Sequence, residues 1–432
     1  MTSYVIIGAG EAGVRAALTL RAEGFTGKVV LLSEEPFSPY ERPPLSKAGL
    51  LHPNSEPQWI ATSEQLSQAA IEFRTNSPVL SINKEERLIT LGQGECLHYD
   101  KLLIATGARP RKLALSQAPA ERVHYFRTLA DCQRIQSTAK AGQTVALIGA
   151  GFIGLELAAS LTQLGVKVHL IESQPRLLSR AVDSALAEIL AKNQVEHGVT
   201  LHLNTCVETA YFTTPEAEQL TLSLASVNAQ STHCKVDWLL IGIGSEPNTQ
   251  LAQEAGLAVN DGLCVTDQMQ TSDPHIYGAG DVCRFTHPLY PNESIRLESW
   301  RCAQEQGEIA AQNMMGQNQS YRAAPWFWSD QFDLGLQKVG MSIGVSQRIE
   351  RQIAPQQRVV FELDNQNRLL AACGVGPGNG IAKDIKVAER LINQQIPVDA
   401  SQLADPNFKL KSLLKPSINP LINPLINPLP TS

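Results

Sequence analysis

Two glycine-rich turns constrain the fold of this chain more strongly than any other feature of its sequence. The first, GAGEAG, runs from Gly8 to Gly13, and the second, GAGFIG, runs from Gly149 to Gly154. Each follows a short apolar strand, opens a helix and leads to a second strand that ends in a glutamate. Glycines at this spacing occur by chance in many loops, but two complete units about a domain apart predict two bound dinucleotides. Proteins that hold two dinucleotides usually pass electrons between them.

Composition and cysteine spacing exclude several other classes of protein. The 432 residues, 43% of them hydrophobic, are enough for two or three packed domains. The net charge of −6 argues against nucleic-acid binding. No apolar run reaches about 18 residues and the N-terminus soon enters a strand, so we expect no membrane span, no signal peptide and a cytoplasmic protein. The eight cysteines form no CxxC or CxxxxC pair, which excludes a sequence-local redox disulfide and offers no iron–sulfur or zinc spacing.

Each residue of the first unit has a physical task. Gly8 permits the tight turn, Gly10 lets the backbone approach a pyrophosphate, and Gly13 lets the helix pack closely on the sheet. The helix N-terminus directs free N–H groups and a positive dipole end at the phosphates. Glu34, at the end of the second strand, can accept hydrogen bonds from both ribose hydroxyls. The unit comprises strands at 4–7 and 29–32 and a helix over 12–22.

The segment PYERPPLSK at 39–47 indicates how the first dinucleotide is used. It carries the cations Arg42 and Lys47, and it lies where disulfide reductases with two dinucleotides place a CxxxxC pair. It contains no cysteine, so a flavin here would hand its electrons outward. Without its context, the same segment is equally typical of a proline-stiffened surface loop.

The second unit favours NADH over NADPH. Strands are expected at 145–148 and 166–171, and Glu172 ends the second of them. An acid at this position bonds the ribose diol and repels the extra phosphate of NADP. Two unit charges about 4 Å apart repel by roughly 4 kcal/mol at an effective dielectric constant of about 20, and solvent reduces this value. Arg176 and Arg180 are close enough in sequence to soften the preference.

Two side chains on the second helix have more than one interpretation. Phe152 either packs in the core or lies over a flavin until nicotinamide displaces it. Glu156, one turn into the helix, is costly to bury without a cation. We expect Lys47 to be its partner, beside flavin N5.

Three further segments complete the expected flavin site. Two strand–glycine exits, 102–108 and 238–244, flank the region 145–237, as expected where a chain enters an inserted domain and returns. A third glycine-rich turn ends in Asp281, which either accepts a bond from a ribityl hydroxyl or caps a helix. A helix over 299–315 would direct its N-terminus at the flavin pyrimidine.

With these motifs, the chain resembles the FAD-containing NADH–ferredoxin reductases of multicomponent oxygenases, from residue 3 to about residue 414. Putidaredoxin and rubredoxin reductases share this layout, and the chain also resembles reductases of aromatic-ring dioxygenases such as the 3-phenylpropionate/cinnamate system. The motifs are PYERPPLSK (39–47), LLIATGARPR (102–111), GAGFIGLELA (149–158), GAGDV (278–282), RLESW (296–300) and PWFWSDQ (325–331).

The resemblance implies an α/β fold with a glutathione-reductase-like layout of two interleaved Rossmann-like domains, for FAD and NADH, and a C-terminal α+β domain. The implied boundaries are 1–108 and 238–318 for the FAD domain, 109–237 for the NADH domain and 319–411 for the C-terminal domain. The glycine-rich run 373–380 is expected to form a loop. The residues 412–432, with three Ile-Asn-Pro-Leu repeats, are expected to be a low-complexity, disordered tail, since proline at every fourth position forbids a helix.

The resemblance also assigns site residues. The implied catalytic residues are Lys47, Glu156 and Phe152. The implied contacts to a tightly held, non-covalent FAD are Gly8, Gly10, Ala12, Gly13, Glu34, Arg42, Lys47, Val79, Arg127, Asp281 and Trp300. The implied contacts to NADH are Gly149, Gly151, Gly154, Glu172 and Gly244.

The implied activity is hydride transfer from NADH to FAD, followed by two single-electron transfers to a small iron–sulfur ferredoxin of Rieske or plant/vertebrate type. The implied protein is a monomer or a homodimer that binds neither membrane nor nucleic acid. Acidic ferredoxins need a positive rim, with Arg109, Arg111, Lys112 and Arg301 as candidates and Trp328 as an apolar contact. The alternatives are a rubredoxin reductase and a flavoprotein resembling apoptosis-inducing factor. An NADH oxidase or peroxidase would need a redox cysteine near Arg42.

Overall fold

The computed structural model describes all residues except 93, 116, 215–216, 227–228 and 415–432. The repeats of the expected tail therefore lie outside the described residues. No helix in the described part of the chain is both long enough and apolar enough to cross a membrane.

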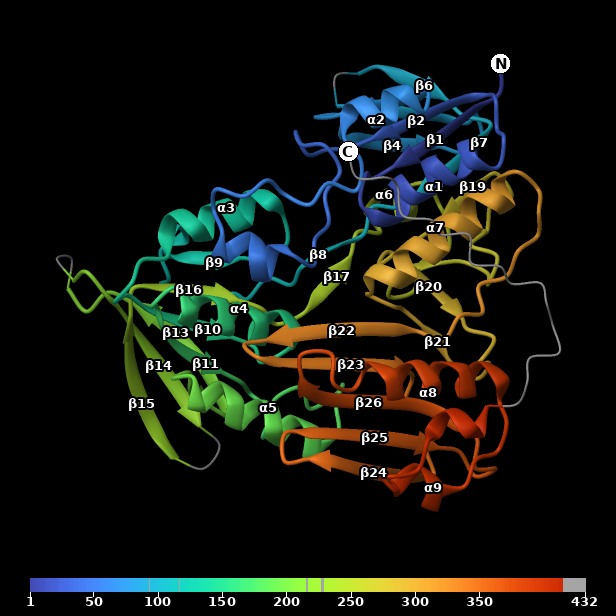
Figure 1. Cartoon of the computed structure of the whole chain (residues 1–432). Coiled ribbons are helices and arrows are strands. Elements are labelled where there is room, and N and C mark those ends of the chain that lie inside the picture. Colours follow the sequence, from blue (N-terminus) through green and yellow to red (C-terminus); the bar gives the residue numbers. More distant parts are fainter. Residues whose placement is uncertain (93, 116, 215–216, 227–228, 415–432) are drawn as a thin grey trace.

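The first sheet consists of five parallel strands in the order β19-β7-β1-β2-β3. Helix α1 (Glu11–Ala22) connects β1 to β2 and packs against helix α7 (Trp300–Met314) on one face of the sheet (Figure 1). The strands are β19 (Ile276–Gly278), β7 (Lys101–Ile104), β1 (Ser3–Ile7), β2 (Lys28–Leu32) and β3 (Ile71–Arg74). Smaller elements around it are α2 (Ser63–Gln68), β4 (Val79–Asn83), β5 (Leu88–Leu91), β6 (Cys96–His98), α6 (Gln250–Glu254), β18 (Leu263–Cys264), β20 (Cys283–Thr286) and β21 (Ser294–Ile295).

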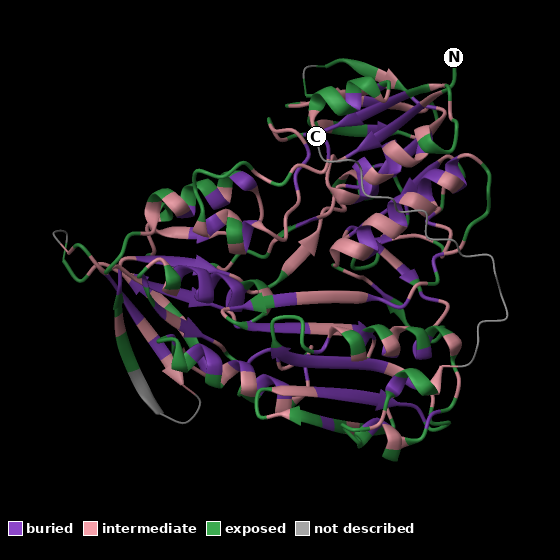
Figure 2. Cartoon of the chain, in the orientation of Figure 1, coloured by how far each residue is buried: buried purple, intermediate pink, exposed green. Residues whose placement is uncertain are grey.

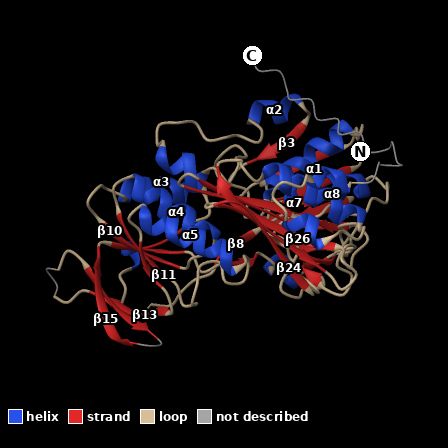
Figure 3. Ribbon diagram, turned by 60° about the horizontal axis from the view of Figure 1, so that its bottom comes forward, coloured by secondary structure: helices blue, strands red, loops and turns tan. Residues whose placement is uncertain are grey.

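The second sheet repeats this arrangement with five parallel strands in the order β12-β11-β10-β16-β9. Figure 3 shows helices α3, α4 and α5 on one side of it, and strands β13 and β15 on the other. The strands are β12 (Thr200–His202), β11 (Lys167–Ile171), β10 (Thr144–Ile148), β16 (Trp238–Ile241) and β9 (Val123–Tyr125). The helices are α3 (Leu129–Thr138), α4 (Phe152–Gln163) and α5 (Ser184–Glu196), and the added antiparallel strands are β13 (Thr205–Tyr211), β14 (Leu220–Ser226) and β15 (Ala229–Val236).

The chain crosses between the two parallel sheets on a short antiparallel ribbon of β8 (Ala108–Pro110) and β17 (Ser245–Pro247). Strand β16 lies before this crossing and pairs with β10 in the second sheet. The boundary expected at residue 238 is therefore wrong for β16, because its apolar residues fill the second sheet. The return to the first sheet follows residue 241.

The third sheet is antiparallel, with strand order β22-β23-β26-β25-β24, and helix α8 (Ala382–Gln394) covers it (Figure 1). The expected loop at 373–380 is wrong over its first half, because residues 373–377 continue β26 in the middle of the sheet. The strands are β22 (Trp326–Gln331), β23 (Leu334–Gly340), β26 (Leu369–Pro377), β25 (Gln357–Leu363) and β24 (Gln347–Ala354). The remaining elements are α9 (Ala400–Ala404) and short helical turns at Leu45–Gly49, Ala120–Arg122 and Leu410–Leu413.

The central strands of both parallel sheets are buried on both faces, as Figure 2 shows for β1 and β10. This burial explains why they appear in the sequence as continuous apolar runs and not as alternating ones. Two parallel sheets with helices and a third, α+β unit match the expected fold class.

Substitution of Gly307 by alanine should destabilise the protein. A Cβ at Gly307 would lie 2.3 Å from the carbonyl oxygen of Ala12, so α1 and α7 would have to separate. We expect a loss of about 1–3 kcal/mol in the free energy of unfolding, measured by urea titration. The control is Glu308→Ala on the same helix, which removes a half-exposed side chain and creates no clash; equal losses in both variants would contradict the prediction.

Candidate active site

The first glycine turn joins β1 to α1 and leaves open space in front of the helix. Gly8 has φ +107°, and a Cβ there would lie 2.3 Å from the Ala105 carbonyl oxygen. A Cβ on Gly13 would lie 1.9 Å from the Gly8 carbonyl oxygen, so strand and helix are in direct contact. A Cβ on Gly10 would meet nothing within 4 Å, and no side chain caps α1 at Gly10. The free amides and the open space fit a pyrophosphate.

The second turn, between β10 and α4, has the same geometry. Gly149 has φ +105°, and a Cβ on Gly154 would lie 2.1 Å from the Gly149 carbonyl oxygen. At Gly151 a Cβ would again meet nothing within 4 Å, and no side chain caps α4 there. This turn also fits a pyrophosphate.

Glu172 and Gly244 both lie near the second turn. Glu172 Oε2 accepts a hydrogen bond of 2.8 Å from the backbone N–H of Ala150, inside the turn. Arg176 donates to the carbonyl oxygens of Ser179 and Val182, so it does not neutralise this carboxylate. Gly244 has φ +102° and open space around it, directly before β17. The acid expected to select the nucleotide thus lies at the glycine turn itself.

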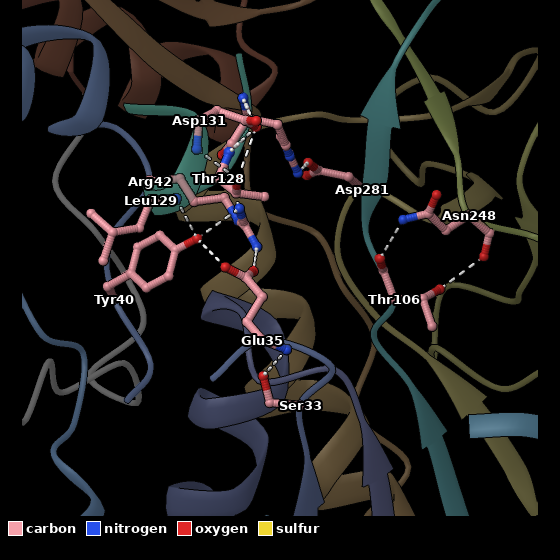
Figure 4. Close-up of polar contacts among 11 residues, drawn as sticks. Ser33, Glu35, Tyr40, Arg42, Thr106, Thr128, Leu129, Asp131, Asn248 and Asp281 are labelled. Atoms are coloured by element: carbon pink, nitrogen blue, oxygen red, sulfur yellow. Dashed lines mark hydrogen bonds and ion pairs between the residues drawn. The ribbon is translucent and has the colours of Figure 1, made fainter. Parts of the chain in front are cut away.

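Two adjacent glutamates after the end of β2 have different surroundings. Glu34 is exposed, whereas the neighbouring Glu35 is partly buried and bonds to Tyr40 and Arg42 (Figure 4). Arg42 Nη2 lies 2.8 Å from Glu35 Oε1, and the Tyr40 hydroxyl donates to Glu35 Oε2 at 2.5 Å. The Tyr40 hydroxyl in turn accepts a bond from the N–H of Leu129. The Tyr40 hydroxyl therefore joins this loop to the first residue of α3.

Arg42, Arg127 and Asp281 come together from three distant segments. Arg42 Nη1 donates to the carbonyl oxygen of Arg127 at 2.9 Å, and Arg127 Nη2 lies 2.7 Å from Asp281 Oδ2. Figure 4 shows Arg42 and Asp281 in the same view as the Thr106–Asn248 pair, where the Asn248 amide donates to the Thr106 carbonyl at 2.8 Å. The Arg127–Asp281 pair therefore joins the third glycine turn to the segment between β9 and α3.

Lys47 and Glu156 form the expected ion pair. Lys47 Nζ lies 3.6 Å from Glu156 Oε1 and 3.4 Å from Asp330 Oδ2. Ser46 donates to Glu156 Oε2 at 2.5 Å, and Ser329 donates to Glu156 Oε1 at 2.8 Å. The carboxylate is 4% exposed, so a cation and two hydroxyl donors compensate for its burial.

Burial raises the pKa of the Glu156 carboxyl above its ordinary value. Lys47 lowers this pKa by its charge, and the hydroxyls of Ser46 and Ser329 lower it by hydrogen bonding, whereas the negative charge of Asp330 raises it. The protonation state of Glu156 therefore depends on groups from the 45–49 turn and from β22.

Aromatic side chains lie next to this pair. Phe152 is half-buried and packs edge-on against Phe327, with ring centroids 4.6 Å apart. Lys47 Nζ lies 5.2 Å from the centroid of the Trp328 ring, which itself packs edge-on against Trp300. Trp300 begins α7, as the helix expected over 299–315 requires.

The other expected residues are more dispersed. Ala12 is buried where α1 meets α7, and Val79 packs at the edge of the first sheet's core. Two of the four rim cations are engaged with acids: Arg109 pairs with Glu246, and Arg301 pairs with two glutamates of α7 and α8. The other two rim candidates, Arg111 and Lys112, are exposed.

Comparison with known proteins identifies the family of this chain. The model of the pyridine nucleotide-disulphide oxidoreductases matches residues 2–307. The chain belongs to the pyridine nucleotide-disulphide oxidoreductase family. A second model, described as a reductase C-terminal domain, matches residues 326–414. The resemblance found in the sequence motifs is thereby confirmed, and the chain is an oxidoreductase.

Relatives and solved structures of this family cover nearly the whole chain. The chain is 35% identical over 378 residues to the 3-phenylpropionate/cinnamic acid dioxygenase ferredoxin–NAD(+) reductase component of Photorhabdus laumondii, covering 87% of this chain and 93% of the relative. It is 35% identical to the anthranilate 1,2-dioxygenase system ferredoxin–NAD(+) reductase component of Burkholderia cepacia, covering 95% and 99%. A solved structure of a covalent putidaredoxin reductase–putidaredoxin complex superposes with a TM-score of 0.88 at 32% identity, covering 95% of this chain and 98% of that chain.

Sequence reasoning missed several residues of this site. Glu35 was passed over because it directly follows Glu34, and only the fold shows which of the two turns inward. Ser46 lies inside the recognised 39–47 segment, and Ser329 lies inside the recognised 325–331 segment, so motif membership was a usable signal for both. Thr106 likewise lies inside the recognised 102–111 segment, whereas Asn248 carries no such signal, because its contact with Thr106 depends on how the two sheets meet.

The pH dependence of the free energy of unfolding should reveal the raised pKa of Glu156. In the unfolded chain the Glu156 carboxyl ionises at pH ~4.3, whereas in the folded protein it keeps its proton to higher pH. The free energy of unfolding therefore falls as the pH rises from the unfolded-state pKa through the raised folded-state pKa. Glu156→Gln removes this titration. The free energy of unfolding of the wild type, minus that of the variant, should therefore decrease with rising pH in urea titrations.

The control for this experiment is Glu254→Gln, at an exposed glutamate. Its difference from the wild type, measured over the same pH range, is the reference for a solvent-exposed glutamate. A difference for Glu156→Gln that falls no more steeply than this reference would contradict the prediction.

Proposed function

We propose that the protein transfers hydride from NADH to a non-covalently bound FAD and passes single electrons to a small iron–sulfur ferredoxin that serves an aromatic-ring dioxygenase. FAD supplies this chemistry because it accepts electrons in pairs and releases them singly. The observation that carries the proposal is the pair of open, uncapped glycine turns at Gly10 and Gly151, in a chain with no cysteine at 39–47. The printed names of the relatives, ferredoxin–NAD(+) reductase components of dioxygenase systems, support it.

The residues around the first turn would hold FAD. The amides at the start of α1 receive the pyrophosphate, with Ala12 in contact and Arg127 neutralising phosphate charge. Asp281 accepts a hydrogen bond from the ribityl chain, and Glu34 accepts bonds from the adenosine ribose. Val79 on the adenine side and Trp300 at the ring complete this set, while Arg42 acts through Glu35 and Arg127.

The residues around the second turn would hold NADH. The amides at the start of α4 receive its pyrophosphate, Glu172 bonds the ribose diol, and Gly244 allows the coenzyme to approach the backbone. Phe152 covers the ring stack until nicotinamide displaces it. Lys47 and Glu156 form a charge pair that orients the lysine and controls the electrostatics near the reacting ring.

The partner surface belongs to the same proposal. Arg111 and Lys112 provide the positive rim for an acidic ferredoxin of Rieske or plant/vertebrate type, and Trp328 provides an apolar contact. The protein acts as a monomer or homodimer in a reducing compartment, the cytoplasm, which its eight free cysteines support.

The function is tested by stopped-flow mixing of the flavin-loaded protein with NADH, followed by a panel of small iron–sulfur proteins. We expect rapid bleaching of the flavin absorbance and fast reduction of a ferredoxin, with the second step slowing steeply as salt rises. NADH–ferricyanide activity, which needs no charged protein partner, is the control and should respond weakly to salt. A protein that retains no flavin would overturn the proposal. Faster reduction of a rubredoxin than of any ferredoxin would make rubredoxin the partner instead.

The coenzyme preference should depend on Glu172. Glu172→Ala removes the repulsion of the NADP phosphate, so the ratio of kcat/KM for NADH over NADPH should fall by roughly tenfold or more. Glu188→Ala, at an exposed glutamate on α5, is the matched control. An unchanged ratio in Glu172→Ala would refute the coenzyme assignment.

A further inference from the structure

A chain of buried side chains leads from α5 to the carboxylate of Glu156. Gln194 Nε2 donates to Gln331 Oε1 at 3.2 Å. Gln331 Nε2 donates to Ser329 Oγ at 3.4 Å, and Ser329 Oγ donates to Glu156 Oε1 at 2.8 Å. The three residues before Glu156 are at most 2% exposed, so this chain is shielded from bulk water.

The carbonyl of Leu155 sets the direction of every bond in this chain. It accepts a hydrogen bond of 3.2 Å from Gln194, and a carbonyl oxygen can only accept, so Gln194 must present its NH₂ group. Gln331 must then present its oxygen to Gln194 and its NH₂ group to Ser329. The hydroxyl proton of Ser329 is left for Glu156, and an ionised carboxylate is the acceptor that suits it.

This arrangement leaves one buried group unsatisfied. Gln194 Oε1 has no hydrogen-bond partner in the described structure. A buried acceptor without a partner is unfavourable. Gln194 keeps this orientation because its NH₂ group donates to both the Leu155 carbonyl and Gln331 Oε1.

We propose that Gln331 is a positioning residue for the Lys47–Glu156 pair, acting through the hydroxyl of Ser329 in a chain whose direction is set by the Leu155 carbonyl. The inference rests on the proposed function, in which this pair lies at the flavin. Gln331 and Ser329 belong to β22, whereas Glu156 belongs to α4. The third sheet thus contributes to the charge pair through Ser329, which Gln331 orients, and through Asp330 beside Lys47.

Loss of the Gln331 amide should change the titration of Glu156. Without that donor, the Ser329 hydroxyl is free to rotate and its bond to the carboxylate weakens, which disfavours the charged form. The charged groups facing Glu156 are Lys47 and Asp330, and Ser46 supplies the other hydroxyl. All of these remain in place when Gln331 is changed.

The experiment compares Gln331→Met, Ser329→Ala and the double variant, all in the flavin-loaded protein. Infrared difference spectroscopy follows the carboxyl band of Glu156 against pH, and Glu156→Gln identifies that band. We expect both single variants to shift the titration to higher pH and to slow flavin reduction by NADH on the order of tenfold. The double variant should match Ser329→Ala alone, because Gln331 acts through Ser329.

The control is Asn193→Leu. It removes the 2.8 Å hydrogen bond from Asn193 Nδ2 to Asp333 Oδ1. This bond joins α5 to the turn after β22 and does not involve Glu156. This variant should keep the wild-type titration. A Gln331→Met titration equal to that of Asn193→Leu, or additive effects in the double variant, would overturn the proposal.

The outcomes separate this inference from the proposed function. If the flavin in Glu156→Gln is reduced by NADH as fast as in the wild type, the charge pair has no role in hydride transfer. The infrared titration then still tests whether Gln331 acts on Glu156 through Ser329. If Gln331→Met does not retain FAD, the same titration is run on the flavin-free proteins, where the expected shift is unchanged.

Discussion

A buried carboxylate needs a cation and hydrogen-bond donors, and Glu156 takes them from two other parts of the chain. The carboxylate stands on α4, its cation Lys47 and one hydroxyl come from the 45–49 turn, and the second hydroxyl comes from Ser329 on β22. Removing any of these partners would leave charge in a medium that solvates it poorly. The relative placement of the three sheets is therefore constrained by this one buried carboxyl group.

The two glycine turns impose a second constraint. In both units the helix touches the preceding strand at a glycine, and the carbonyl oxygen lies where a Cβ would be. This contact brings the first amides of each helix close to the sheet edge, with open space in front of them. The same local geometry occurs twice, so the different roles of the two sites come from their surroundings: Arg127 and Asp281 beside one, and Glu172 beside the other.

Much of this layout was predictable from the sequence because its signals are local. The turn at 149–154 and the acid that follows its second strand are set by chain geometry over about twenty residues. The Lys47–Glu156 pair was predictable for another reason: a charged residue in an apolar helix requires a partner, and the 39–47 segment offered a cation. The family motifs then gave the order of the units.

Other features were not readable in this way. Residues 373–377 form a strand, although glycines favour loops, because neighbouring strands supply hydrogen-bond partners and leave little space above them. Strand β16 belongs to the second sheet because it pairs with β10 on one side and with β9 on the other. The choice of Glu35 as the partner of Arg42 likewise depends on where α3 lies.

The sequence by itself determined the two nucleotide units, their order and the class of chemistry, since each depends on residues close together in the chain. Only the tertiary structure decided which side chains from different sheets share one carboxylate, and in which direction their hydrogen bonds run. The contacts of Ser46 and Ser329 with Glu156 join residues more than a hundred positions apart, and no local pattern specifies them, because burial and partner geometry arise only when the sheets pack.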